Sequence, residues 1–148
     1  MTGCAGHPYS PAVSVVVLNF NGRDYLPACL KSLMNTEYPE DKIDITVVDN
    51  ASSDGSLELV RQDFPEVNVF ASGANLGFAV GNNIGIRKAV GEFVALINPD
   101  TEVTPGWLRP LVETMKSSPN IAAVCPKLLL YEDRLAIHLH SATFIPEE

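Results

Sequence analysis

Apolar and polar positions along the chain alternate between two periods. Val13–Leu18 is apolar at nearly every position and rich in β-branched residues, which predicts a strand covered on both faces. The apolar residues from Tyr25 to Leu33 recur at helical spacing, with Pro27 tolerated in the first turn. Ile43–Val48 predicts a second strand, and Val67–Phe70 predicts a third. Between them, Leu57–Phe64 predicts a second helix, with Asp54 as its N-cap and Pro65 at its end.

The second half of the chain continues this alternation after a glycine-rich segment. Gly73–Gly85 holds four glycines and three asparagines, which weaken a helix, so we expect a turn there and a helix only from about Ile84 to Val90. Phe93–Ile97 predicts a strand, and Pro105 would open a helix that runs to Met115. The remaining predicted strands are Ile121–Val124 and Lys127–Tyr131, while Arg134–Ile145 is either a strand or a loop.

Strands that alternate with helices of this length indicate β-α-β crossovers. The predicted fold is therefore α/β, with a mainly parallel Rossmann-like sheet and helices on both faces. The 148 residues suffice for one ordinary domain, which we place at 13–148 behind a flexible lead at 1–12.

Charge and apolar content narrow the classes of partner. Ten basic against 18 acidic residues give a formal charge of −8, which disfavours binding to nucleic acid and means that an anionic ligand needs local help, such as a cation. No apolar run reaches the roughly 20 residues of a membrane-spanning helix. Residues 1–12 lack a basic region followed by an apolar region, so we expect a loose lead there and not a signal peptide. Cys4, Cys29 and Cys125 form no C-x-x-C pair. These observations predict a cytoplasmic protein.

Polar residues follow three of the predicted strands at the point where each ends. In an open parallel sheet, ligands bind outside the carboxyl ends of the strands, so Asn19–Gly22, Asp49–Asn50 and Asn98–Asp100 are the candidate site. The Asp100 carboxylate, with Glu102 nearby, offers hard oxygen ligands that suit Mg²⁺ or Mn²⁺, and such a cation would neutralise a diphosphate. Asp49 could accept a hydrogen bond from a ring N–H.

Four ordered motifs carry a resemblance to a known family. They are Val13-Ser-Val-Val-Val-Leu-Asn-Phe-Asn21, Val47-Val-Asp-Asn-Ala-Ser-Ser-Asp-Gly-Ser56, Asn75-Leu-Gly-Phe-Ala-Val-Gly-Asn-Asn-Ile-Gly85 and Asn98-Pro-Asp100. Together they resemble the N-terminal half of a family-two glycosyltransferase, over about 13–144, and the third motif with Asn98 is similar to its rhamnosyltransferase-like branch. The resemblance implies the GT-A fold, a nucleotide-sugar donor, a divalent cation and inversion at the anomeric carbon.

The resemblance also assigns residues. The family's base pocket falls on Asn19 to Asn21 and Asp49, and its D-x-D element falls on Asn98-Pro99-Asp100, where Asn98 replaces the first aspartate, so the metal is assigned to Asp100. Asn82 stands where many members have an arginine near the diphosphate. The nucleotide-sugar-binding residues implied are Asn19, Phe20, Asn21, Asp49, Asn50, Ser52, Asn75, Gly77, Phe78, Asn83, Asn98 and Asp100.

The family's catalytic base is an acid downstream of the D-x-D element. The acids after Glu102 are Glu113, Glu132, Asp133, Glu147 and Glu148, and none of them stands in a matching context. We therefore expect the base beyond Glu148, a chain truncated at its C-terminal end, and no transfer by this fragment alone. An exposed apolar patch should remain and could form a homo-oligomer. The implied partners are a dTDP- or UDP-sugar and a glycan or lipid-linked acceptor, in polysaccharide or cell-envelope glycan synthesis at the inner face of the membrane.

Two other functions stay open. One is a nucleotide-sugar-binding module without turnover, which the sequence does not separate from a donor-binding half. The other is a flavodoxin-like signalling domain phosphorylated on Asp49, although Asn19 and Asn21 stand where its acidic pair would be. His138 and His140 lack a third metal ligand at suitable spacing, and Trp107 has the helical spacing of a core residue.

Overall fold

A computed structural model describes residues 10–130 and the backbone of 137–139. Contacts divide the chain into two compact units, Met1–Gly106 and Trp107–Glu148. Within the part that is described, no helix is long and apolar enough to cross a membrane.

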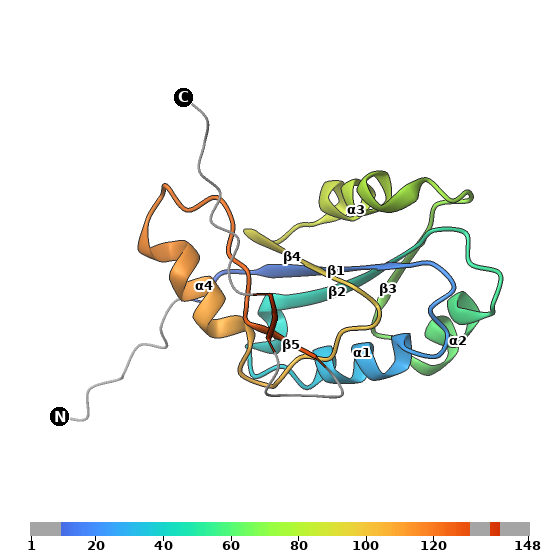
Figure 1. Cartoon of the computed structure of the whole chain (residues 1–148), viewed down its shortest axis with the longest axis horizontal. Helices are drawn as coiled ribbons and strands as arrows, with labels where there is room; N and C mark the ends of the chain where they lie inside the picture. The colour runs from blue at the N-terminus through green and yellow to red at the C-terminus, as the bar shows by residue number, and fades with distance from the viewer. Residues whose placement is uncertain (1–9, 131–136, 140–148) are drawn as a thin grey trace. The chain divides into compact units, whose positions relative to one another are not determined.

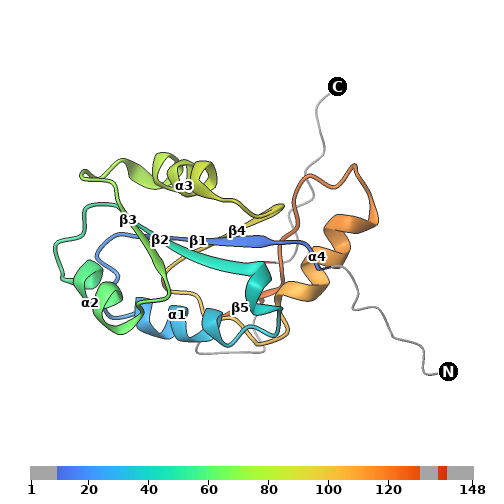
Figure 2. The same ribbon diagram turned by 180° about the vertical axis from the view of Figure 1, so that it is seen from behind.

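The first unit is a parallel sheet with helices on both faces. Its strands, in spatial order, are β3 (Asn68–Ala71), β2 (Ile43–Asp49), β1 (Val13–Asn19) and β4 (Phe93–Ile97), all parallel. Its helices are α1 (Leu26–Met34), α2 (Ser56–Asp63) and α3 (Gly77–Lys88), with a short 3-10 turn η1 (Glu40–Lys42). Helices α1 and α2 lie on one face and α3 on the other (Figures 1 and 2). The predicted α/β class with a mainly parallel sheet is confirmed.

Strand β1 is the centre of the core because strands flank it on both sides. All seven of its residues are buried, as its continuous apolar run predicts. Its side chains alternate between the two faces: Val16 and Leu18 pack with Val48 and α3, and the odd-numbered residues face the other helix layer. Leu26, Cys29, Leu30 and Leu33 form the buried face of α1, as their helical spacing predicts.

Helix α3 begins seven residues before the predicted start at Ile84, so that boundary was wrong. Two of its glycines explain the difference. A Cβ on Gly81 would collide with the side chain of Leu18, and a Cβ on Gly85 would collide with that of Val16. The glycines therefore let the helix backbone lie directly on β1, and this packing outweighs their low helix propensity.

The start of α2 differs from the prediction by one residue. The N-cap position is Gly55, at φ +78°, and not Asp54. Asp54 still satisfies the helix terminus, because its Oδ1 accepts the N–H of Ser56 at 3.0 Å.

The second unit contains α4 (Leu108–Ser117) and an antiparallel pair, β5 (Leu128–Leu129) and β6 (Ile137–Leu139). The strand predicted at Ile121–Val124 is wrong: that segment has no regular secondary structure and no strand partner among the described residues. Pro105 lies three residues before α4 and not in its first turn. The rest of the Arg134–Ile145 prediction, the side chains of His138 and His140, and the acids Glu132, Asp133, Glu147 and Glu148 lie outside the described residues.

Strand β4 exposes large apolar side chains. Val94 is 39% and Leu96 48% exposed, and both point to the face of the sheet that carries α3. Val90, just before the strand, is 86% exposed. Exposed apolar surface is therefore present in the described part of the chain, while its role in a homo-oligomer stays a prediction.

Candidate functional site

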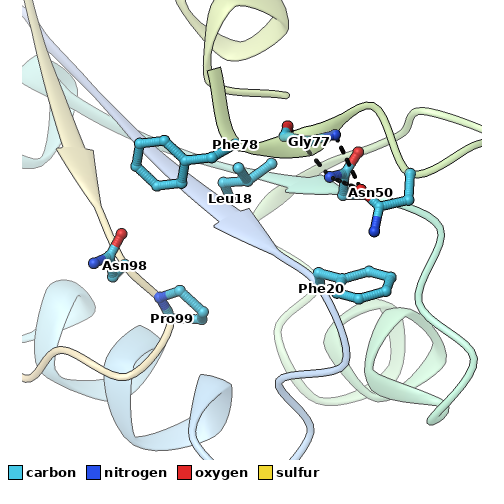
Figure 3. Close-up of a pocket in the computed structure, with 8 residues that line it drawn as sticks. Leu18, Phe20, Asn50, Gly77, Phe78, Asn98 and Pro99 are labelled. Atoms are coloured by element: carbon cyan, nitrogen blue, oxygen red, sulfur yellow. Dashed lines mark hydrogen bonds between the residues drawn. The ribbon is translucent and has the colours of Figure 1, made fainter. Parts of the chain in front are cut away.

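A pocket of about 350 Å³ opens at the carboxyl edge of the sheet, where β1, β2 and β4 end. It is lined by Leu18, Phe20, Asn50, Asn75, Gly77, Phe78, Asn98 and Pro99 (Figure 3). Six of the twelve predicted site residues are among them: Phe20, Asn50, Asn75, Gly77, Phe78 and Asn98. The strand-end rule thus brings together side chains from four separate segments of the chain.

Asn50, the residue after β2, holds the turn that precedes α3. Its Nδ2 donates to Asn75 Oδ1 at 2.9 Å, and its Oδ1 accepts the N–H of Leu76 at 2.9 Å. Asn75 Oδ1 also accepts the N–H of Gly77 at 3.0 Å, where the backbone has a φ of +77° that favours glycine. The Asn50 amide and the Asn75 Oδ1 are therefore engaged within the pocket wall and shape it.

Asn19 and Asp49 lie beneath the pocket and not in its lining. Asn19 Nδ2 donates to Asp49 Oδ1 at 3.0 Å, and Asp49 Oδ2 accepts the N–H of Ser52 at 3.1 Å. The same Nδ2 lies 3.0 Å from Ser52 Oγ and 2.8 Å from Ser56 Oγ. Asn19 is fully buried and Asp49 is 1% exposed. This polar cluster therefore joins the ends of β1 and β2 to the start of α2.

The Asn19 carboxamide oxygen is buried and has no hydrogen-bond partner among the described residues. It points towards Gly22, where a Cβ would collide with it. Position 22 therefore requires glycine, because a side chain there would collide with the Asn19 carboxamide oxygen. An unsatisfied buried acceptor costs roughly 1–3 kcal/mol, so the site would gain from a bound donor such as water.

Two loops at the site are joined by hydrogen bonds. Asn21, at φ +53°, donates its N–H to Ser52 Oγ at 2.9 Å, and its Oδ1 accepts the N–H of Ser53 at 2.8 Å. The Arg23 guanidinium donates from Nη1 to the carbonyl oxygens of Asp54 and Gly55, at 3.2 and 2.9 Å. Phe20, at the start of the first loop, is therefore held from both ends, by β1 and by the second loop.

The pKa of Asp54 is lowered by the same loop contacts. Slight desolvation raises it, but hydrogen bonds from the side chain and N–H of Ser56 and from the N–H of Arg23 together outweigh that effect. Asp54 thus stays ionised and accepts hydrogen bonds from the N–H of Arg23 in the first loop and from the N–H of Ser56 at the end of the second.

Asp100 is exposed, and its carboxylate is free to take up a cation. The neighbouring Cys29 thiol is buried and donates to the Asn98 carbonyl oxygen at 3.7 Å. Burial first, and then the negative charges of Asp100 and Glu102, raise the pKa of Cys29 to about 12, so the thiol stays neutral. No group of three or more metal-ligating side chains occurs among the described residues. A Mg²⁺ or Mn²⁺ held by one protein carboxylate and by ligand phosphates needs no such group.

The other predicted residues lie apart from the pocket lining. Asn83 is exposed on α3. Asn82 is 5% exposed and donates from Nδ2 to the carbonyl oxygen of Phe78 at 3.0 Å, so it braces the helix. Leu18 and Pro99 line the pocket and were missed as site residues. Their positions at the last apolar residue of β1 and inside Asn98-Pro99-Asp100 were the available signal.

Burial of Asp49 argues against the phospho-acceptor alternative. An acceptor aspartate must reach a phosphoryl donor, whereas Asp49 is 1% exposed and both its oxygens accept internal hydrogen bonds.

Comparisons with known proteins identify the family. The profile described as "Glycosyl transferase family 2" matches residues 14–146. Glycosyltransferase AglE of Haloferax volcanii is 28% identical over 111 residues, which cover 73% of this chain and 36% of AglE. Putative glycosyltransferase EpsH of Bacillus subtilis is 30% identical over 126 residues, which cover 84% of this chain and 36% of EpsH. The chain thus spans about a third of the length of these relatives.

Solved structures agree with the fold. The mannosyltransferase PcManGT from Pyrobaculum calidifontis, solved with GDP-Man and Mn²⁺, has a TM-score of 0.69 and 28% identity, covering 77% of this chain and 34% of its own. The TarS 1-349 structure of S. aureus in complex with UDP has a TM-score of 0.65 at 22% identity, covering 84% of this chain and 43% of its own. The GT-A-like fold is therefore confirmed, and the chain belongs to glycosyl transferase family 2.

Proposed function

We propose that this chain is the donor-binding part of an inverting glycosyltransferase of the rhamnosyltransferase-like branch, and that it holds a dTDP- or UDP-sugar at the pocket on the carboxyl edge of the sheet. One observation carries the proposal most directly: a pocket lined by two aromatic rings and three amides lies beside the exposed Asp100, in a chain of this family. Nucleotide-sugar complexes of similar structures support it.

The nucleobase would occupy the end of the pocket at Phe20. This ring is 48% exposed although its backbone is held, so it offers a fixed flat surface. Stacking of a base on an aromatic side chain contributes roughly 1–3 kcal/mol. Asp49 is 1% exposed and lies outside the pocket lining, so its carboxylate would accept a base N–H only if binding of the donor exposes it.

The donor diphosphate would lie at Asp100. Its two negative charges meet no cationic side chain in the described pocket lining, so a divalent cation is the group that would compensate them. The Asp100 carboxylate fits such a hard cation and would hold it, and a bound cation would supply charge compensation for the diphosphate leaving group. Asn98 and Pro99 would fix the direction of Asp100.

Transfer itself would need a general base within hydrogen-bonding reach of the acceptor hydroxyl. None of the described residues that line the pocket is an acid, and Asp49 and Asp54 beside it already accept hydrogen bonds. We assign the base to sequence beyond Glu148, and the acceptor to a glycan or lipid-linked glycan at the cytoplasmic face of the membrane.

Titration calorimetry with UDP and dTDP, in Mn²⁺ and in chelator, tests the proposal. Binding that strengthens with Mn²⁺ is the expected result. A folded chain that binds neither nucleotide at millimolar concentration would refute the donor site. Binding without any turnover of donor in the full-length protein would instead support the module without catalysis.

A further inference from the structure

The ring of Phe78 is exposed at a place where the fold does not need it. Phe78 is 68% exposed in the first turn of α3 and lines the pocket. The helix packs on the sheet through Gly81 and Gly85 instead. A large apolar side chain left in water forgoes the free energy of burial, which a ligand covering the ring would recover.

The backbone that carries this ring is fixed before any ligand arrives. Gly77 donates its N–H to Asn75 Oδ1 at 3.0 Å, and Asn75 is itself held by Asn50 at 2.9 Å. On the following turn, the buried Asn82 donates to the Phe78 carbonyl oxygen at 3.0 Å. A side chain on a preorganised backbone loses little entropy on binding, which is how recognition residues are usually built.

The pocket has two distinct ends. Figure 3 shows Phe78 and Asn98 on one side of Leu18, and Phe20 and Asn50 on the other. Asn98 is two residues before Asp100, so the Phe78 end is the one next to the carboxylate that would hold the metal and the diphosphate. A donor with its base at Phe20 and its diphosphate at Asp100 then brings its glycosyl end towards Phe78.

We propose that Phe78 packs against the apolar face of the donor's glycosyl ring and so distinguishes a nucleoside-diphosphate sugar from the free nucleoside diphosphate. This inference rests on the proposed function. The face of an aromatic ring is electron-rich and attracts the C–H groups of a sugar, whereas it gives nothing to a phosphate oxygen. Asn98 lies on the same side of Leu18 as Phe78 (Figure 3), so its amide is a polar group placed for sugar hydroxyls at this end.

The test is to compare Phe78→Ala with the unaltered chain in titration calorimetry with Mn²⁺. The probes are matched pairs with and without sugar: UDP and UDP-glucose, dTDP and dTDP-glucose, GDP and GDP-mannose. For each nucleotide that the unaltered chain binds, we expect Phe78→Ala to weaken binding of the sugar-bearing member about tenfold, which is about 1.4 kcal/mol, and to change binding of the free nucleotide less than twofold. Phe78→Tyr, which keeps the ring face, should restore sugar binding.

Val80→Ala is the matched control, because Val80 is 47% exposed on the same helix and is not in the pocket lining. It should leave both members of each pair unchanged. Equal weakening of both members by Phe78→Ala, or no weakening of either, overturns the inference while the donor site stands. Absence of nucleotide binding by the unaltered chain overturns both.

Discussion

Replacement of Gly85 by alanine tests whether α3 is placed by tertiary packing or by its own helix propensity. In an isolated helix, alanine in place of glycine stabilises by roughly 0.8–1 kcal/mol. In this chain the Cβ added at position 85 would lie 3.1 Å from Cγ2 and 3.2 Å from Cβ of Val16, and closer still to Cγ1 of Val16. Val16 is 1% exposed in the central strand, so it has nowhere to move.

Overpacking costs roughly 1–3 kcal/mol, and the close approach of Val16 Cγ1 places this site in the upper half of that range, at about 2–3 kcal/mol. After subtraction of the propensity gain, the net loss of unfolding free energy should be about 1–2 kcal/mol. Urea unfolding followed by circular dichroism measures it. Asn83→Ala is the control, because Asn83 is exposed on the same helix and should gain a few tenths of a kcal/mol from propensity alone. Combining Gly85→Ala with Val16→Ala should cost less than the sum of the two changes, because the second makes room for the first.

A Gly85→Ala chain more stable than the unaltered one would refute the argument. So would strictly additive effects in the double variant, because the collision with Val16 would then not be the cause.

Three further predictions follow from the site and its surroundings. Asp100→Asn should abolish the Mn²⁺ dependence of UDP or dTDP binding and leave affinity for uridine or thymidine nearly unchanged, as measured by calorimetry; an equal loss for nucleoside and diphosphate would indicate a structural role. Folding raises the pKa of Cys29 from 9.0 to about 12, so between these pH values the unfolded chain loses the thiol proton while the folded chain keeps it, and the free energy of unfolding falls as pH rises from 9 towards 12. Cys29→Val should make that fall smaller when urea unfolding is compared at pH 8 and pH 10, and a fall of unchanged size would contradict the argument. Self-association through the apolar face of β4 should appear in sedimentation velocity and diminish in Leu96→Lys, with Met34→Lys on α1 as a control of similar exposure (48% against 44%); a monomer at all concentrations would refute it.

Much of the site could be predicted from the sequence because parallel strands share one carboxyl edge. Polar residues that follow β1, β2 and β4 must meet there once the strands are recognised, and Asn50 and Asn98 do line one pocket. This rule does not predict how deeply each side chain is buried. It treats Asn19, Asp49 and Phe20 alike, whereas the pleat turns Asn19 and Asp49 into a buried cluster and leaves Phe20 exposed in the pocket lining.

The sequence by itself determined the strands of the sheet, the α/β class and the order of the four motifs, since these depend on local periodicity and on residue types at strand ends. The tertiary structure alone decided where α3 begins, because its glycines are unfavourable in an isolated helix and become favourable only when Val16 and Leu18 lie against them. It also decided that Ile121–Val124 is not a strand, because a β-branched or apolar run becomes a strand only when a partner satisfies its backbone hydrogen bonds, and none does so among the described residues.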